Sequence, residues 1–261
     1  MKVVILCGGY GTRIRDVSES APKPMIPIGS FPIIWHIMKH YAHYGHREFV
    51  LCLGYKAHVI KDFFLNYQAL TNDFTLTFGA QESIEYHSQS DITGWKITLA
   101  DTGLDALTGT RVLRIQDYLR DDEDFFLTYG DGVGSVDLDA LLAFHQSHGR
   151  ALTVTGVRPP GRFGELGFDH DSGQIREFNE KPQVSEGRIS GGFFVCRKGF
   201  LDALDPNENQ MFEQEPMTRL VQEGQVMVYR HDDFWQCMDT YRDYKLLNRL
   251  WEAGDPPWKC W

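Results

Sequence analysis

The sequence predicts an α/β fold: a mixed, mostly parallel sheet with helices on both faces and an embedded β-rich portion. Three observations predict it. In the first 70 residues, short apolar runs alternate with segments of helical spacing, which is typical of parallel strands joined by right-handed crossovers. Two later segments alternate with the period of two that strands show. Between residues 150 and 200, turn-forming residues separate short strand-like runs.

The first two strands are expected at residues 3–6, an apolar run that ends at glycines, and at residues 49–53. Between them, Pro32 begins a helical pattern that ends near Gly45. A second helical spacing follows over residues 59–67, so the chain begins strand, helix, strand, helix.

The middle of the chain predicts half-exposed strands at residues 74–78 and 95–99, a buried strand at 125–129, a helix over 138–148 and a strand over 152–157. A hairpin turn is expected at residues 171–173, and the short strands of residues 150–200 are expected to lie over the sheet. Helices are expected at 215–223 and 241–253. We expect one continuous domain over residues 1–261.

The composition excludes several classes of protein. With 42% hydrophobic and 24% charged residues, the chain can bury a core and does not resemble a disordered protein. A net charge of −10 argues against broad nucleic-acid binding. We expect no membrane-spanning segment and no signal peptide. The five cysteines lack CxxC spacing, which predicts reduced thiols and a cytoplasmic protein.

A glycine-rich segment follows the first expected strand. Gly8, Gly9 and Gly11 would let backbone N–H groups approach a phosphate closely. Thr12 and Arg13 would add a hydroxyl and a fork of donors. The segment is neither a Walker A loop nor the complete dinucleotide fingerprint, and a plain tight turn is the alternative interpretation.

Lys23 lies between Pro22 and Pro24, ten residues after Arg13. The two prolines would hold the lysine in a stiff, extended segment. It is either a phosphate-binding cation or a solvated loop charge.

Two aspartates are candidate metal ligands. Asp131 lies between glycines at the carboxyl end of an expected strand, where ligands gather in open α/β sheets; an ordinary Asp in a strand-to-helix turn is the alternative. Asp239 lies in an aromatic and apolar stretch where a lone carboxylate is costly to bury, and its alternative role is the N-cap of the helix expected from Tyr241. Two carboxylates together with substrate phosphates can hold Mg²⁺.

Two later segments carry further candidates. Glu180 and Lys181 follow an expected strand and offer a carboxylate and an ammonium group, or form a charge pair of little energetic value. Ser190 and Gly191 precede an apolar run, where they permit close approach of a ligand or mark a β-bulge. By contrast, His36, His40 and His43 lack acidic partners at zinc-site spacing and predict a polar helix face.

Taken in order, these segments resemble the signature of the sugar-1-phosphate nucleotidylyltransferases. The first motif is LCGGYGTR at residues 6–13, followed by PKPM at 22–25. Within that family, the cytidylyltransferase branch is the nearest resemblance, through segments at residues 32–38, 54–56, 101–103, 128–133, 159–164, 191–195, 234–236 and 257–258. The resemblance covers essentially the whole chain.

The resemblance implies a Rossmann-like nucleotide-binding fold and a Mg²⁺-dependent reaction in which CTP and α-D-glucose 1-phosphate give CDP-glucose and pyrophosphate. Residues 1–150 would mainly bind the nucleotide, and residues 151–261 would carry the β-rich sugar-phosphate-binding portion. The resemblance also implies a homo-oligomer, such as a hexamer, and from the composition neither a nucleic acid nor a membrane is an expected partner.

The resemblance assigns roles residue by residue. Arg13 and Lys23 would hold the triphosphate and, with the metal ligands Asp131 and Asp239, form the catalytic set. Glu180 would hold sugar hydroxyls and Lys181 the sugar phosphate, beside Ser190 and Gly191. Residues 108–111 would form a loop that reaches a nucleotide, in the same or a neighbouring subunit. The complete nucleotide-binding set would be Leu6, Cys7, Gly8, Gly9, Tyr10, Gly11, Thr12, Arg13, Lys23, Thr108, Arg111 and Gly130.

Two departures from the family pattern leave the substrate open. Ser190 stands where the family usually has Asn, and its shorter side chain offers one hydroxyl in place of an amide. Thr110 stands where a second Gly is usual. Another sugar 1-phosphate, or UTP or dTTP in place of CTP, is therefore an alternative. A non-catalytic sugar-nucleotide-binding regulatory protein is the alternative from another class, although the candidate charged residues are all present.

Overall fold

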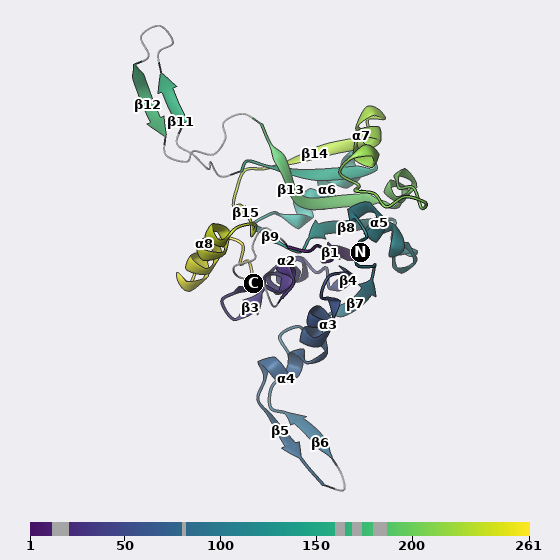
Figure 1. Ribbon diagram of the computed structural model, residues 1–261, viewed down its shortest axis with the longest axis vertical. Helices are drawn as coiled ribbons and strands as arrows, with labels where there is room; N and C mark the ends of the chain where they lie inside the picture. The colour runs from purple at the N-terminus through teal and green to yellow at the C-terminus, as the bar shows by residue number, and fades with distance from the viewer. Residues whose placement is uncertain (12–20, 80–81, 160–164, 169–173, 180–186) are drawn as a thin grey trace.

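The computed structural model describes residues 1–11, 21–79, 82–159, 165–168, 174–179 and 187–261 (Figure 1). Its centre is a seven-stranded sheet in the order β14-β10-β13-β8-β1-β4-β7. Four of the six neighbouring pairs are parallel, and β13 runs antiparallel to both β8 and β10. The predicted mixed, mostly parallel sheet is thus confirmed. The strands are β1 (Val3–Leu6), β4 (Glu48–Leu53), β7 (Lys96–Asp101), β8 (Asp124–Tyr129), β10 (Leu152–Val157), β13 (Ile189–Arg197) and β14 (Val226–His231).

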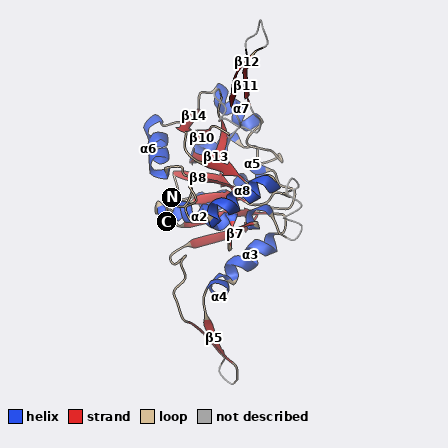
Figure 2. Cartoon of the chain, turned by 90° about the vertical axis from the view of Figure 1, so that its left-hand side faces the viewer, coloured by secondary structure: helices blue, strands red, loops and turns tan. Residues whose placement is uncertain are grey.

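Helices cover both faces of this sheet, as predicted; Figure 2 shows α6 and α5 on opposite sides of it. Successive residues of β1 point to opposite faces, so Val3 and Ile5 join one buried cluster while Val4 and Leu6 join the other. The first cluster includes side chains of α2, α6 and α8, and the second includes side chains of α5 and α7. The helices are α2 (Ile33–His43), α3 (Ala57–Leu65), α4 (Tyr67–Thr71), α5 (Thr108–Arg114), α6 (Leu138–His148), α7 (Glu215–Gln222) and α8 (Tyr241–Glu252), with 3-10 helices η2 (Lys23–Met25), η3 (Gln116–Leu119) and η4 (Lys198–Ala203).

Eight short strands form four further two-stranded sheets. Two of these hairpins, β5–β6 and β11–β12, project from opposite ends of the body (Figure 1). The pairs are β2 (Pro27–Ile28) with β3 (Phe31–Pro32), β5 (Phe74–Thr77) with β6 (Ser83–Tyr86), β9 (Gly132–Gly134) with β15 (Trp235–Cys237), and β11 (Glu165–Phe168) with β12 (Ile175–Asn179).

Some expected elements differ from those observed. The helix expected over residues 59–67 is two helices, α3 and α4, separated at Asn66. The strand expected to be half-exposed at residues 74–78 is exposed along its whole length, because β5 pairs only with β6 in a hairpin that projects from the body. The strands expected to lie over the sheet are partly wrong: β10 and β13 belong to it. The hairpin turn at residues 171–173 lies outside the described residues.

The prediction of a polar helix face at three histidines is wrong for two of them. His36 and His40 are buried in α2, and each lies within hydrogen-bond distance of a backbone carbonyl, that of Ile28 at 3.0 Å and that of Val136 at 2.8 Å. All five cysteines lie within the described residues and are free thiols. In the described parts of the chain, every helix is too short or too polar to cross a membrane.

Candidate active site

A cavity of about 650 Å³ opens where β1 and β8 end, at the carboxyl edge of parallel strands. The sheet brings its lining together from segments far apart in the sequence, as the ligand edge of an open α/β sheet does. Of the predicted site residues, those that line the cavity are Leu6, Cys7, Gly8, Gly9, Tyr10, Gly11, Lys23, Thr108, Arg111, Gly130, Asp131, Ser190, Gly191 and Asp239. Thr12, Arg13, Glu180 and Lys181 lie outside the described residues.

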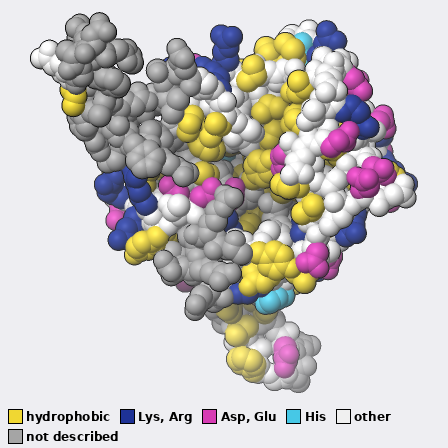
Figure 3. All heavy atoms as spheres, turned by 45° about the horizontal axis from the view of Figure 1, so that its top comes forward, with side chains coloured by type: hydrophobic (Ala, Val, Ile, Leu, Met, Phe, Trp, Pro, Cys, Tyr) yellow, Lys and Arg dark blue, Asp and Glu magenta, His cyan; other side chains and the backbone are white. Residues whose placement is uncertain are grey.

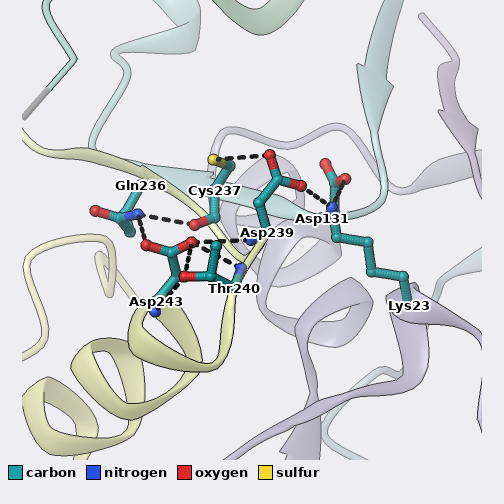
Figure 4. A network of polar contacts seen from close by, with 7 residues as sticks. All are labelled: Lys23, Asp131, Gln236, Cys237, Asp239, Thr240 and Asp243. Carbon is teal, nitrogen blue, oxygen red and sulfur yellow. Dashed lines mark hydrogen bonds and ion pairs between the residues drawn. The ribbon is translucent and has the colours of Figure 1, made fainter. Parts of the chain in front are cut away.

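Lys23 links the two candidate metal ligands (Figure 4). Its Nζ lies 2.6 Å from Oδ2 of Asp131 and also donates to Oδ1 of Asp239. Burial disfavours the charged ammonium, but the two carboxylates outweigh it and raise the pKa of Lys23. The two carboxylates therefore converge on one cation, although they are 108 residues apart in the sequence.

The structure excludes the cap interpretation of Asp239. The N-cap of α8 is Thr240, and Asp243 completes a capping box with it. The backbone N–H of Asp239 itself donates to Oδ2 of Asp243 at 3.1 Å, which leaves its carboxylate directed toward Lys23 (Figure 4). Asp131 likewise does not start a helix, since β8 is followed directly by β9.

These two carboxylates fit a hard divalent cation. The Lys23 ammonium already lies at the point on which both converge, and oxygen ligands of this kind suit Mg²⁺. Within the described residues, no group of three or more His, Cys, Asp or Glu side chains could hold a metal. The remaining ligands would therefore come from substrate phosphates and water, as is usual for Mg²⁺.

Cys237 lies beside this pair, with its Sγ 3.7 Å from Oδ2 of Asp239. Burial, followed by the nearby carboxylates of Asp239 and Asp131, raises the pKa of the thiol to about 12. The group therefore stays protonated and is a weak ligand for a metal.

Arg111 is buried and fastens the glycine-rich segment to its neighbours. Its guanidinium donates to the carbonyl of Gly8 at 3.1 Å and to that of Leu53 at 3.0 Å. It also donates to the Thr102 hydroxyl and to the carbonyls of Gly103 and Leu104. Burial lowers the pKa of Arg111. The guanidinium thus braces the backbone of the cavity wall as well as lining it.

The expectation of a loop at residues 108–111 is wrong, since these residues form the first turn of α5. The N–H groups of Gly109 and Thr110 donate to the Gln210 carbonyl, which satisfies part of the helix N-terminus. A Cβ at Gly109 would lie 3.0 Å from that carbonyl oxygen, so the close contact favours glycine. Thr110 is helical, so the backbone freedom of a second glycine is not required there.

The β-bulge that was one interpretation of the segment 190–192 is confirmed, and the binding of a ligand there stays a prediction. The register between β10 and β13 shifts here, which is a β-bulge, and the same residues line the cavity. The indole Nε1 of Trp235 donates to the Gly191 carbonyl at 2.7 Å. The bulge is therefore fixed against the strand that precedes Asp239.

Other lining residues were not singled out as site residues from the sequence. Asp105 is one of them, and it accepts a hydrogen bond from the hydroxyl of the predicted site residue Tyr10 at 2.6 Å. Trp235, Met211 and Tyr129 also line it. The TYGDGV motif already contained Tyr129, but an isolated Met or Asp in a loop carries no signal of this position.

The fold and this site are those of a nucleotide-dependent transferase of the α/β class. The chain belongs to the nucleotidyl transferase family, whose profile matches residues 2–252. It is 46% identical to glucose-1-phosphate cytidylyltransferase of Salmonella typhi over 261 residues, which are the full length of both proteins. It is 44% identical, again over the full length of both, to a protein of Bacillus subtilis described as a probable glucose-1-phosphate cytidylyltransferase.

Solved structures of low sequence identity share the fold. HddC from Yersinia pseudotuberculosis has a TM-score of 0.67 at 21% identity, and the match covers 96% of this chain and 99% of that one. A putative glucose-1-phosphate thymidylyltransferase from Bacillus anthracis gives the same TM-score at 15% identity. The overall fold therefore persists when most side chains differ.

Proposed function

We propose that this chain is a glucose-1-phosphate cytidylyltransferase, which joins CTP and α-D-glucose 1-phosphate to give CDP-glucose and pyrophosphate. The observation that carries the proposal is the full-length identity of 46% to the Salmonella typhi enzyme. The cavity supports it, because the glycine-rich segment and a converging pair of carboxylates meet at one sheet edge.

In this proposal Asp131 and Asp239 hold Mg²⁺, and Lys23 lies within reach of the phosphates that share the metal. The magnesium ion neutralises charge on the triphosphate when bound. Arg13 adds a cation to the triphosphate, Lys181 pairs with the sugar phosphate, and Glu180 accepts from sugar hydroxyls. These last three roles rest on the motifs alone.

The reaction needs positioning and charge neutralisation rather than a covalent intermediate on the protein. A phosphate oxygen of the sugar phosphate forms a bond to the α-phosphorus of CTP. The bond from that phosphorus to the bridging oxygen breaks, and pyrophosphate leaves with the electron pair. The attacking oxygen is already ionised, so no general base is required. The cationic side chains offset the repulsion between the two anions.

One observation, at Ser190, favours a second candidate for the sugar substrate. Ser190 lines the cavity, and its hydroxyl oxygen lies 3.4 Å from the Gly192 N–H. A serine reaches less far than the asparagine usual in the family, so a sugar 1-phosphate other than that of glucose is the alternative substrate.

The proposal also covers the cellular compartment, the oligomeric state and the part of the chain that binds each substrate. The protein would act in the cytoplasm as a homo-oligomer, with residues 1–150 mainly on the nucleotide and 151–261 mainly on the sugar phosphate. The face in Figure 3 intersperses acidic and basic side chains, and the net charge is −10, so a nucleic acid is not an expected partner.

The test is pyrophosphate release with Mg²⁺ over a panel of CTP, UTP, dTTP, ATP and GTP, each with glucose 1-phosphate and other sugar 1-phosphates. Asp131→Ala serves as the inactive control. Turnover with CTP and glucose 1-phosphate above all other pairs supports the proposal. Turnover only with another sugar identifies Ser190 as the specificity change, and no turnover with any pair favours a sugar-nucleotide-binding regulatory protein.

A further inference from the structure

Two hydroxyl groups, those of Thr108 and Tyr129, line the cavity, and Thr108 belongs to the proposed nucleotide-binding set. Thr108 begins α5, and Tyr129 ends β8, so both belong to regular elements. Both side chains are partly buried. The hydroxyl of each has one proton to donate and two lone pairs to accept with, so the direction of that proton decides what kind of ligand group it can face.

Glu213 lies behind this wall and accepts a hydrogen bond from each of the two hydroxyls. The Tyr129 hydroxyl lies 2.6 Å from Oε1 of Glu213, and the Thr108 hydroxyl contacts Oε2 of the same carboxylate. An ionised carboxylate has acceptors only, so each hydroxyl must be the donor in its bond. Neither hydroxyl then has a proton left for a ligand, and each keeps acceptor capacity.

The neighbouring backbone and rings fix this arrangement. The N–H of Phe212 donates to Oγ1 of Thr108 at 3.3 Å, which holds the Glu213 segment against α5. The Tyr129 ring packs against Phe194 and stacks on Phe212. Burial and then the Glu213 charge raise the pKa of Tyr129, so the phenol keeps the proton that it donates.

We propose that Glu213 is a specificity-determining positioning residue that accepts the hydrogen bonds of the Thr108 and Tyr129 hydroxyls. The cavity wall then offers these two oxygens as acceptors, which favour the exocyclic amine of cytosine over the carbonyl O4 of uracil or thymine. The inference rests on the proposed function, and it names the group that selects among pyrimidine nucleotides.

The hydrogen-bonding groups of the bases distinguish cytosine from uracil and thymine. Cytosine presents an N–H donor at its exocyclic amine, whereas uracil and thymine present an acceptor at the equivalent position. An acceptor facing an acceptor leaves both unsatisfied in a partly buried site. Sites that depend on one such hydrogen bond discriminate strongly against the analogue that lacks it.

Glu213→Gln tests the proposal. An amide can donate through its nitrogen, so one hydroxyl becomes free to turn its own proton into the cavity. We expect the ratio of kcat/KM for CTP to that for UTP to fall by about tenfold or more, the factor that one misplaced hydrogen bond sets. Glu208→Gln, an exposed carboxylate of the same segment, is the matched control and should leave the ratio unchanged.

Direct binding of CTP and of UTP by calorimetry accompanies the kinetics, so the inference is tested separately from the reaction. Wild-type protein that binds CTP above UTP but releases no pyrophosphate contradicts the proposed function alone. An unchanged CTP-to-UTP ratio in Glu213→Gln, with both nucleotides weakened equally, reduces Glu213 to a structural role and overturns the inference.

Thr108→Val is the second variant, for use where Glu213→Gln does not fold. It removes one acceptor and its proton together, and it should also lower the CTP-to-UTP ratio. An unchanged ratio in this variant likewise overturns the inference.

Discussion

Thr240 and Asp243 cap α8 reciprocally. Oγ1 of Thr240 accepts from the Asp243 N–H at 3.3 Å, and the Thr240 N–H donates to Oδ2 of Asp243 at 2.8 Å. Because this pair satisfies the helix N-terminus, Asp239 is not needed as a cap. The same Asp243 oxygen accepts from the Asp239 N–H, so the cap also positions the backbone of a candidate metal ligand.

Thr240→Ala should therefore affect both stability and metal binding. Losing the cap costs about 1 kcal/mol of unfolding free energy. The Thr240 hydroxyl also donates at 2.9 Å to the Asp243 oxygen that anchors the Asp239 backbone, so its loss frees that carboxylate to shift, and the Mg²⁺ concentration for half-maximal activity should rise. Asp137→Ala is the matched control, since Asp137 caps α6 by accepting from the Ala140 N–H at 2.9 Å. It should lose similar stability with an unchanged Mg²⁺ requirement. An equal Mg²⁺ requirement in both variants would show that the α8 cap does not affect the candidate metal site.

Asp131→Ala should nearly abolish turnover while the fold remains intact. In the proposed site, removing one of the two carboxylates would leave Mg²⁺ with one protein ligand, and a loss of about 1,000-fold in kcat is expected for the charge stabilisation that the metal would supply. Circular dichroism and the thermal transition should match the parent. Asp121→Asn, an exposed change, is the control. Activity within a few-fold of the parent would remove Asp131 from the metal site.

Lys23→Met should make the protein more responsive to Mg²⁺. Without the ammonium, the carboxylates of Asp131 and Asp239 face each other uncompensated, so the metal-free protein loses stability. Added Mg²⁺ should then raise the Tm of the variant more than that of the parent, because the cation no longer competes with Nζ. Turnover should stay low, since the phosphates lose a cation. An identical Mg²⁺-induced Tm shift in both proteins would show that Lys23 and the metal do not share these ligands.

The sequence predicts those features that depend on local pattern. The buried strands β1, β4 and β8 each contain a run of apolar residues, and the helix of residues 138–148 matches α6 in both bounds. The glycines and carboxylates of the cavity follow from their positions at strand ends.

Other features depend on long-range packing and leave no local signal. The burial of His36 arises because Trp251, Trp258 and Trp261 surround it from the other end of the chain. Glu213 reads as an ordinary loop carboxylate in the sequence, and only the approach of its segment to α5 and β8 gives it partners. A strand pattern likewise cannot tell that β5 projects from the body.

Gly192→Ala should destabilise the protein through two effects. Gly192 has φ of +77°, and a Cβ there would lie 2.6 Å from Cδ2 of Tyr129. Gly187→Ala is the matched control, because Gly187 has φ of +94° with open space around its Cβ position. Backbone strain costs about 1 kcal/mol in each, and the clash adds a further loss of about 1–3 kcal/mol in Gly192→Ala. Urea unfolding measures the difference, and equal losses would contradict the contact with Tyr129.

Stability should fall as the pH drops from about 6.5 to about 4, because of His36 and His40. Burial lowers the pKa of each from 6.5 to about 4. A base with a lowered pKa in the folded state binds more protons when unfolded, so its contribution is complete above pH 6.5 and is lost toward pH 4. Each histidine can account for up to about 3 kcal/mol of the free energy of unfolding at full effect.

Urea unfolding between pH 7.5 and 4.5 should show a flatter pH dependence in His36→Gln and His40→Gln than in the parent. His43→Gln, an exposed change on the same helix, should keep the parent slope. The parent slope in all three variants would assign the acid sensitivity to other groups.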